Sequence, residues 1–365
     1  MVEIAQLPPG TMRIPADRAR GFVTAVFEAA GFPAGDASLI AEVLISADLR
    51  GVRSHGLSRL RYFMVRVENG VLNATPNTEF TAGSSTTGVL DADNGHGAVA
   101  CAEAMDRAIS MAREHGSGWV AVANSNHFGY AGYWAERARG QGCVGFAMAN
   151  SAGRVTPTFG RDSLLGTNPL AVGIPGAEGE TGFLLDMATS VVAVGKVETA
   201  LREGRQIPDG WVNQEAATAS LDESGILGYD TPLLPLGGAG DVTGGHKGFA
   251  LNLMVELLCG VLGGTSLTDR IAGASGDAPA AMGQLVGAIR LDGFRPPAEI
   301  HGSMAETIEI VRGAEKASGH DTIFIPGEPE AIATAENDAA GIPVTPAVRT
   351  DVEAVAVSYG VEVPW

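Results

Sequence analysis

The segment 51–59 places a hydroxyl, an imidazole and a guanidinium within six residues, between two predicted helices. An arginine guanidinium can bind a carboxylate through two parallel hydrogen bonds, and a histidine can exchange a proton near neutral pH. Ser54, His55 and Arg59 therefore have the chemistry to hold a small organic acid and to move a proton to or from its neighbouring oxygen. The alternatives are structural, because Ser54 could cap a helix and Arg59 could be an ordinary surface charge.

A second histidine follows a predicted buried strand. The apolar run 119–123 is typical of such a strand, and the next segment, Asn-Ser-Asn-His-Phe-Gly at 124–129, contains His127. The segment 131–139 then has the pattern of a helix. Because α/β proteins commonly bind ligands where a strand ends and a helix begins, His127 is a second candidate for proton transfer. A single histidine is more often structural, so a structural role and a role in proton transfer both stay open at this point.

Glycines surround Lys247 directly before a mostly apolar predicted helix. Glycine-rich turns at helix N-termini present backbone N–H groups that bind phosphate. A lysine is unfavourable at this positive end of a helix unless an anion lies beside it. We therefore predict a phosphate-binding role for Lys247 and Gly248.

The segment 95–100, Gly-His-Gly-Ala-Val-Ala, follows a predicted strand and opens a predicted helix, as the Rossmann fingerprint does. In the Rossmann fold, the next strand leads to an acidic residue that binds ribose. The next predicted strand in this chain ends in Asn124 and Ser125 instead. We therefore do not expect a Rossmann dinucleotide site.

Helical periodicity dominates residues 16–70, and strands alternate with helices from about residue 81. The predicted helices are 16–30, 36–49, 57–69, 98–114, 131–139, 191–202 and 247–262. The predicted strands are 87–90, 119–123, 143–150, 170–174, 182–185 and 285–289. The tail from 303 to 359 is again helical, with breaks at 327–329 and 341–343, and the segments 237–245 and 272–281 have the composition of loops.

The composition limits the class of protein. The 365 residues are 45% hydrophobic, which is enough for one large domain or two ordinary ones. Their net charge of −18 argues against nucleic-acid binding, which needs clustered Lys and Arg. We expect no signal peptide and no membrane span, because the longest apolar stretch, 249–262, is short and interrupted by polar residues. Cys101, Cys143 and Cys259 lie in apolar patterns without metal-like spacing, so we expect buried thiols, no metal site and a cytoplasmic location.

Further motifs are Leu-Asp-Ala-Asp-Asn-Gly at 90–95, Gly-Thr-Asn-Pro-Leu at 166–170, Leu-Asp-Met-Ala-Thr-Ser at 185–190, Met-Gly-Gln-Leu at 282–285 and Pro-Gly-Glu-Pro-Glu at 326–330. Together with the segments around His55, His127 and Lys247, they resemble the type-2 malate/L-lactate dehydrogenases in sequence and in order. That family includes ureidoglycolate dehydrogenase, 2,3-diketogulonate reductase, sulfolactate dehydrogenase and the cyclic-imine carboxylate reductases. The resemblance extends through most of the chain.

The resemblance implies a three-layer α/β/α fold with a mixed sheet that is not a Rossmann fold, together with a helical region from both ends of the chain. We expect residues 81–299 to form the cofactor-binding α/β domain. Residues 1–80 and 300–365 should form a mostly helical region for substrate binding and dimerisation. The implied cofactor is NAD or NADP, the implied substrate is a small carboxylate, and the implied assembly is a homodimer with sites completed across the interface.

The resemblance also implies roles for individual residues. Arg59 and Thr167 match substrate ligands, and Ser54 matches a hydroxyl that supports the imidazole of His55. His55 matches the proposed proton donor of some members and His127 the proposed proton acceptor of others, and we favour His55. The residues that match cofactor contacts are Phe128, Gly129, Asp186, Met187, Ala188, Thr189, Ser190, Lys247, Gly248, Gly327 and Glu328.

Two points within these motifs have alternatives. Thr189 or Ser190 could simply cap a helix that begins near residue 191. Arg53 departs from the acidic or small residue that relatives often carry before Ser-His, and it could either change which acid fits or point to solvent.

These roles predict reversible hydride transfer between nicotinamide C4 and C2 of a small, malate- or lactate-like 2-oxo or 2-hydroxy acid. One alternative is a cyclic imino-acid reductase, which would reduce a C=N bond on the same fold. Another is a non-catalytic nucleotide-binding or assembly protein, although a chain that retains Ser54, His55, Arg59, His127 and Lys247 does not favour it. The glycine-rich segment 237–244 is most similar to malate-type members, but the acid and the choice between NAD and NADP stay open.

Overall fold

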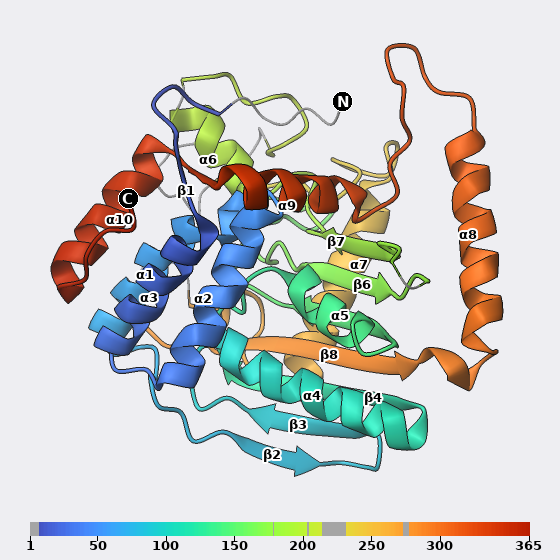
Figure 1. Ribbon diagram of the computed structural model, residues 1–365, viewed down its shortest axis with the longest axis horizontal. Coiled ribbons are helices and arrows are strands. Elements are labelled where there is room, and N and C mark those ends of the chain that lie inside the picture. The colour runs from blue at the N-terminus through green and yellow to red at the C-terminus, as the bar shows by residue number, and fades with distance from the viewer. Residues whose placement is uncertain (1–6, 178, 203, 214–230, 273–276) are drawn as a thin grey trace.

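A seven-stranded mixed sheet forms the centre of the molecule (Figure 1), in the order β2-β3-β4-β8-β5-β6-β7. The computed structural model describes residues 7–365 apart from 178, 203, 214–230 and 273–276. The strands are β2 (Glu79–Ala82), β3 (Thr87–Asp91), β4 (Ser117–Ser125), β5 (Cys143–Ala149), β6 (Leu170–Ile174), β7 (Phe183–Met187) and β8 (Met282–Arg290). Neighbours β3 and β4 run parallel, and the other neighbouring pairs in this sheet are antiparallel.

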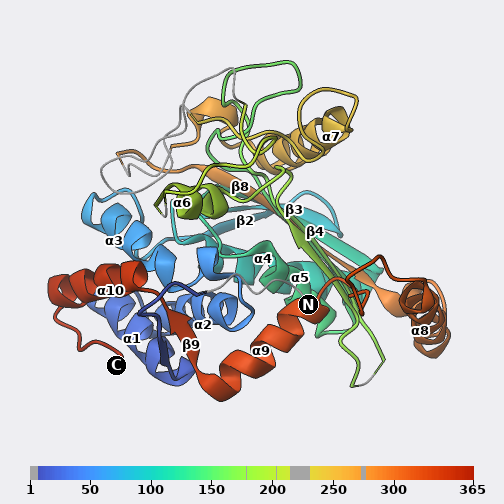
Figure 2. The same ribbon diagram turned by 90° about the horizontal axis from the view of Figure 1, so that it is seen from above.

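Helices cover both faces of the sheet (Figure 2). Helices α4 (Gly97–His115) and α5 (Ala131–Arg139) lie on one face, and α7 (Gly245–Glu256) with the π-helical turn η3 (Leu257–Val261) lies on the other. Glycines allow the close approach of α4 and α5, because a Cβ on Gly118 of β4 or Gly145 of β5 would overlap a helix carbonyl. The predicted three-layer α/β/α fold with a mixed sheet is therefore confirmed.

Both ends of the chain build a further group of helices beside α4. It contains α1 (Ala16–Ala29), α2 (Ala34–Leu49), α3 (Leu60–Glu68), α9 (Glu328–Ala340) and α10 (Pro346–Tyr359). The strands β1 (Met12–Ile14) and β9 (Ile342–Val344) join the two ends as an antiparallel pair. One hydrophobic core runs from α1 and α2 through α4 into the sheet. The division into the two predicted domains stays a prediction.

Two helices lie outside these layers. Helix α6 (Val194–Arg202) follows β7, and α8 (Pro297–Gly313) stands apart from the body of the molecule without a buried residue (Figure 1). Short 3-10 turns η4 (Thr268–Arg270) and η5 (Leu291–Gly293) complete the connections on either side of β8. Among the residues that the structure describes, no helix is both long and apolar enough to span a membrane.

Most predicted elements are present, with shifted ends. The predicted helix 57–69 begins with a 3-10 turn before α3, and the predicted helix 247–262 ends in the π-helical turn. The strands β1, β2 and β9 were not predicted. The three cysteines are buried and free, as expected.

Candidate active site

Two short 3-10 turns, η1 (Arg53–His55) and η2 (Leu57–Arg59), connect α2 to α3 and carry the first group of candidate residues. Buried Asp48 near the end of α2 holds these turns, because its Oδ2 accepts a hydrogen bond from the Leu57 N–H at 2.8 Å. Gly56 is required between them, since a Cβ there would overlap the Asp48 carboxyl group. The direction of the chain from His55 to Arg59 is therefore set by packing against α2.

Within these turns, Ser54, His55 and Arg59 contact one another. The Ser54 Oγ lies 2.8 Å from His55 Nδ1, and the Arg59 Nε donates to the Ser54 carbonyl oxygen at 2.7 Å. Ser54 caps no helix, so the capping alternative for this residue is wrong. Within the described part of the chain, the terminal Nη atoms of Arg59 make no hydrogen bond or ion pair, which leaves them available for a carboxylate.

His127 reaches the same place from the sheet. The register of β4 shifts near its end, where Asn124 has φ of 50°, and beyond the strand the chain turns at Gly129 with φ of 86°. The Gly129 N–H donates to His127 Nδ1 at 3.1 Å, so the neutral ring carries its proton on Nε2. The ring centroids of His127 and His55 are 5.4 Å apart. The two predicted histidine motifs therefore meet.

Asn126 fixes the strand end beside His127. Its Nδ2 donates to the carbonyl oxygens of Asn94 and Gly95 at 2.9 and 3.0 Å. Its Oδ1 accepts from Arg66 Nε at 3.2 Å, and its own carbonyl accepts from Gln284 Nε2 at 3.1 Å. Arg66 belongs to α3, so this contact fastens the helix that follows Arg59 to the strand end that carries His127.

Sequence reasoning assigned no role to Arg66, Asn126 or Gln284. Two of them lay inside recognised segments, since Asn126 precedes His127 and Gln284 lies in the segment 282–285. Their burial was the missing signal, because all three side chains are buried and polar.

The electrostatics keep both imidazoles neutral. Burial, and then the nearby Arg59 guanidinium, lower the pKa of His55 to about 3. Burial, followed by His55, Arg59 and His96, holds the pKa of His127 well below its usual value. Both residues are nevertheless partly accessible to solvent. Solvent therefore reaches part of each side chain, although protein surrounds most of it.

The N-terminus of α4 is closed to a phosphate. His96 precedes α4, and its Nδ1 accepts the Ala98 N–H at 3.1 Å. A Cβ on Gly97 would overlap the Asn126 carbonyl oxygen, so this glycine permits the close passage of the His127 segment. The Gly-x-Gly segment is thus a packing feature at the start of α4.

Asp186 and the segment 127–132 lie side by side. The Asp186 Oδ2, at the end of β7, accepts the Gly132 N–H in the first turn of α5 at 2.9 Å. Its protein surroundings raise the pKa of Asp186 to about 6, although the residue is accessible to solvent. Phe128 is buried, and its carbonyl accepts from Trp134 Nε1 at 3.0 Å. The motif that contains Asp186, Met187 and Ala188 is thereby placed beside the His127 turn.

Thr189 joins this motif to Thr167. Its N–H and Oγ1 donate to the Thr167 carbonyl at 2.9 and 3.0 Å, and Oγ1 also donates to the Asn168 carbonyl at 3.0 Å. Ser190 Oγ donates to the Val192 carbonyl at 2.8 Å. Neither hydroxyl caps α6, which begins at Val194, so the capping alternative is wrong for both.

The start of α6 returns to the histidine turns. A Cβ on Gly195 would lie 3.4 Å from Ser54 Cβ, in ordinary contact. The segment 186–195 therefore runs from the N-terminus of α5, past the Thr167 turn, to Ser54.

Lys247 and Gly248 lie in the first turn of α7, Lys247 on its exposed side and Gly248 on its packed side. Lys247 is exposed, and a Cβ on Gly248 would overlap the Leu236 carbonyl oxygen. The Leu236 N–H donates to the Thr189 carbonyl at 2.9 Å, which connects this turn to the segment 186–195. Among the described residues, Lys247 is not one of the charges that lower the pKa of His55 or His127.

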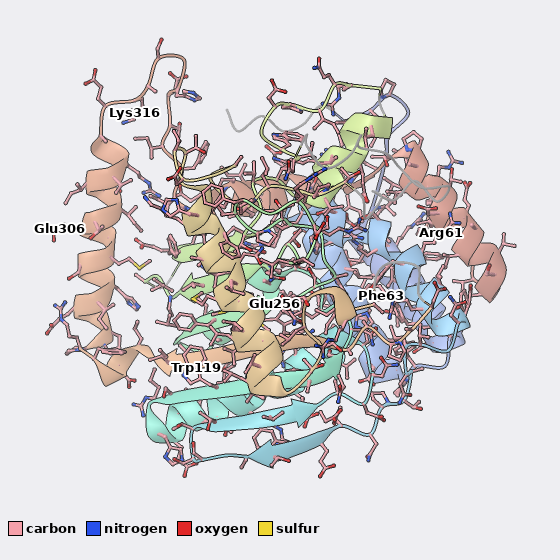
Figure 3. All side chains as sticks on the ribbon, turned by 180° about the vertical axis from the view of Figure 1, so that it is seen from behind. Arg61, Phe63, Trp119, Glu256, Glu306 and Lys316 are labelled. Atoms are coloured by element: carbon pink, nitrogen blue, oxygen red, sulfur yellow. The ribbon has the colours of Figure 1, made fainter. Side chains whose placement is uncertain are left out.

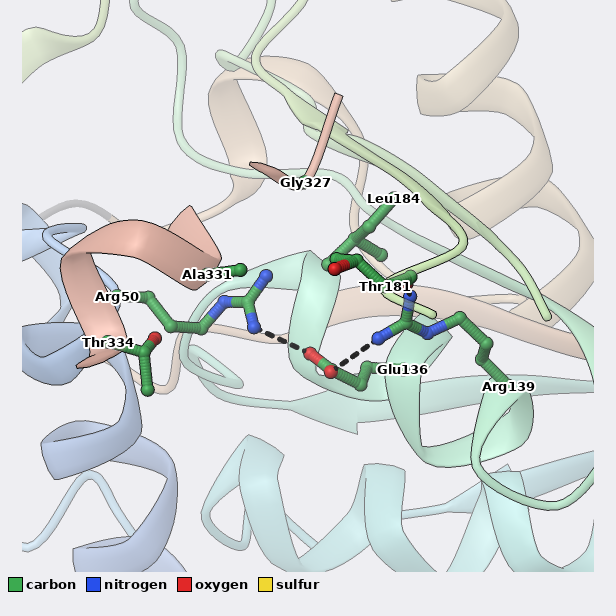
Figure 4. Close-up of a pocket in the computed structure, with 8 residues that line it drawn as sticks. All are labelled: Arg50, Glu136, Arg139, Thr181, Leu184, Gly327, Ala331 and Thr334. Atoms are coloured by element: carbon green, nitrogen blue, oxygen red, sulfur yellow. Dashed lines mark hydrogen bonds and ion pairs between the residues drawn. The ribbon is translucent and has the colours of Figure 1, made fainter. Parts of the chain in front are cut away.

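Gly327 lines a cavity of about 210 Å³ at the N-terminus of α9 (Figure 4). The lining residues are Arg50, Glu136, Arg139, Thr181, Leu184, Gly327, Ala331 and Thr334. Glu136 forms ion pairs with Arg50 and Arg139 at 2.9 and 2.7 Å, as Figure 4 shows. Glu328 does not line this cavity. Its carboxylate accepts the Ile325 N–H at 2.7 Å and pairs with Arg312.

The chain is similar to known proteins in both sequence and structure. A sequence model of the family described as malate/L-lactate dehydrogenase matches residues 14–353. The chain is 38% identical to a malate dehydrogenase of Pyrococcus abyssi over 363 residues, which cover 99% of each chain. Its structure matches that of a malate dehydrogenase from Pyrococcus horikoshii with a TM-score of 0.88 and 33% identity over 100% of each chain.

A more distant structural match is a delta1-piperideine-2-carboxylate reductase from Pseudomonas syringae, with a TM-score of 0.78 and 28% identity, covering 94% of this chain and 100% of that one. The family match and the relative from P. abyssi each span nearly the whole sequence. The chain therefore belongs to the malate/L-lactate dehydrogenase family.

Proposed function

We propose that this protein transfers a hydride between nicotinamide C4 and C2 of a small, malate- or lactate-like 2-oxo or 2-hydroxy acid. The observation that carries the proposal is the convergence of one guanidinium with two neutral imidazoles. Arg59 is fixed through Nε, which leaves both Nη atoms for the two oxygens of a carboxylate. His55 and His127 lie within reach of the same small molecule, because their ring centroids are 5.4 Å apart.

The contacts of the two Nδ1 atoms favour His55 as the proton carrier. His55 Nδ1 faces the Ser54 hydroxyl, which can donate to a neutral ring or accept from a protonated one. His127 Nδ1 faces the Gly129 N–H, which can only donate. His127 therefore stays a neutral donor at Nε2. It would polarise the C2 oxygen, and His55 would supply or remove the proton.

The residues beside this pair fit a nicotinamide dinucleotide. The cofactor, when bound, supplies or accepts the hydride. Phe128 and Gly129 would lie beside its reactive ring, and Asp186, Met187, Ala188, Thr189 and Ser190 would follow its length. Lys247 and Gly248 would hold phosphate at the N-terminus of α7. Gly327 would face it across the 210 Å³ cavity, with Glu328 holding the adjacent turn.

Thr167 is the second proposed substrate ligand, because its turn lies against Thr189. We further propose that the protein acts in the cytoplasm as a homodimer. Its buried, free cysteines support a reducing compartment. NAD and NADP are both retained as candidate cofactors.

The testing experiment is oxidation of NADH and of NADPH against a panel of 2-oxo acids and cyclic imino acids. Turnover of a 2-oxo acid that is lost in His55→Ala supports the proposal. Tight cofactor binding without turnover of any acid would overturn it and favour a nucleotide-binding protein.

A cyclic imino-acid reductase is the second candidate, supported by the structural likeness to the piperideine-carboxylate reductase. It predicts turnover of the imino acids in the same panel, with the 2-oxo acids inactive.

A further inference from the structure

Glu256 is a buried acid that the proposed reaction does not use. It is the last residue of α7 and is 1% exposed, and Figure 3 shows it near the middle of the molecule. Its Oε2 accepts from Asn168 Nδ2 at 2.9 Å, and its Oε1 accepts from the Thr268 N–H at 2.7 Å and from Asn150 Nδ2 at 3.4 Å. Every one of these partners is a donor, so both carboxylate oxygens have to act as acceptors.

The Asn168 amide can have only one orientation in this network. Its Oδ1 accepts the Ser151 N–H at 3.1 Å, which directs its Nδ2 toward α7. There, Nδ2 donates both to Glu256 and to Asn252 Oδ1, the latter at 2.9 Å. Asn252 in turn donates to the Gly166 carbonyl at 2.8 Å. Helix α7 thus holds both ends of the turn 166–168.

This turn is held in an unfavourable backbone conformation. Asn168 has φ of 38°, in the left-handed region of backbone conformation that residues other than glycine seldom adopt. The turn contains Thr167, and the carbonyls of Thr167 and Asn168 both accept the hydroxyl of Thr189. One helix therefore carries Lys247 at its start and fixes Thr167 and Thr189 from its end.

We propose that Glu256 is a positioning residue, whose carboxylate holds the Asn168 amide and thereby sets Thr167 at the substrate and Thr189 beside the cofactor segment. The inference rests on the proposed function, because Thr167 as a substrate ligand is part of it. Glu256 itself does not touch the reacting atoms.

The direct test is Glu256→Gln, which keeps the size of the side chain. A glutamine offers one acceptor oxygen, and its NH2 group must then face another donor. We expect the KM for the active acid to rise by about tenfold or more, as for loss of a buried, charged hydrogen bond. Leu257→Gln is the matched control, because Leu257 is the next residue, the first of η3, is 48% exposed and should leave KM unchanged.

A second measurement needs no turnover. In the protein without cofactor, hydrogen exchange in peptides that cover 164–170 and 187–191 should be faster in Glu256→Gln, since the Thr189 N–H bonds to Thr167. Exchange in α2 should be unchanged. The exchange measurement tests the positioning role of Glu256 without any activity assay. Turnover by the wild type tests the proposed dehydrogenase function separately, so failure of one proposal can be told from failure of the other.

A double-mutant cycle separates positioning from general stability. Asn168→Gly adopts a positive φ without support from a side chain. In that background, Glu256→Gln should change KM by about twofold at most, because the contact it breaks is already absent. The proposal is overturned if Glu256→Gln leaves KM and exchange as in the wild type, or if its effect is the same in both backgrounds.

Discussion

The imidazole of His55 lies 5.4 Å from that of His127, centroid to centroid, with the ring planes at 32°. One ring comes from the turn between α2 and α3, and the other comes from the end of β4. Tyr62 and Phe63 of α3 contact the His127 ring at centroid distances of 6.1 and 6.0 Å. The helix that follows Arg59 therefore also determines how the two rings approach each other.

The contrast between the two Nδ1 contacts predicts different effects of substitution. His55→Ala should lower kcat by about 10²–10⁴-fold, the usual contribution of a general acid or base. His127→Asn, which keeps a donor, should lower it by about tenfold, the size of one neutral hydrogen bond. Added imidazole should restore activity to His55→Ala and not to His127→Ala. Rescue of His127→Ala alone would reverse the assignment of the proton carrier.

The low pKa of His55 predicts the pH dependence of the reaction. Burial lowers this pKa to about 3, so the ring of the free enzyme is neutral between pH 5 and 8. Reduction consumes a protonated ring, and log kcat/KM for the 2-oxo acid should therefore rise by about one per unit decrease in pH. Oxidation uses the neutral ring and should stay flat over this range. A plateau of the reduction profile below pH 6.5 would show that His55 titrates normally.

Arg59 should act on the substrate and not on the cofactor. Lysine keeps the charge but loses the planar fork that binds both carboxylate oxygens. Arg59→Lys should therefore lower kcat/KM by about 10²-fold, the equivalent of about 3 kcal/mol. The Kd for NADH, measured by fluorescence, should be unchanged. Arg61→Lys is the matched control, because Arg61 pairs with Asp351 on the surface and should behave as wild type.

Local patterns predicted the elements that position the site. The helix 131–139 and the strand 170–174 have the predicted ends, since their apolar periodicity is uninterrupted. The pair of β1 and β9 could not be predicted, because Met12–Ile14 and Ile342–Val344 are short and pair only across the whole chain. The edge strand β2 is largely exposed and has no buried face to produce a pattern.

The residues of the candidate site also divide into those that local sequence predicts and those that it does not. His55, Arg59 and His127 could be predicted because their side chains carry the chemistry. Asn126 could not, because its contacts with Arg66 and Gln284 join residues 60 and 158 positions apart. Such partners become visible only when the fold brings them together.

Gly129 should be required both for its backbone conformation and for space. Its φ is 86°, and a Cβ there would overlap Val43 of α2. Gly116 has φ of 94° with no atom near such a Cβ. Gly116→Ala should lower the free energy of unfolding by about 1–2 kcal/mol, the cost of left-handed backbone. In Gly129→Ala the free energy of unfolding should fall by about 1–3 kcal/mol more than in Gly116→Ala, because the added Cβ overpacks against Val43. This variant should also bind NADH more weakly.

Equal losses in these two variants, measured by urea denaturation, would show that α2 moves aside at no cost. Val43→Ala should partly restore the stability of Gly129→Ala and should not restore that of Gly116→Ala.

His96 should make the folded protein sensitive to acid. It is 1% exposed, and burial lowers its pKa to about 3. Below the unfolded value of about 6.5, only the unfolded chain binds this proton, so the free energy of unfolding falls by about 1.4 kcal/mol per pH unit. His96→Asn keeps an acceptor for the Ala98 N–H but does not titrate.

Between pH 6.5 and 5, the wild type should therefore lose about 2 kcal/mol more stability than His96→Asn. Buried Asp48 changes the free energy of unfolding with pH in the opposite direction. Burial raises its pKa to about 7, so its stabilising contribution is lost as the pH rises toward that value. That term is the same in both proteins and cancels in the difference. Urea denaturation at the two pH values measures the difference, and equal losses would mean that the His96 ring is protonated inside the folded core.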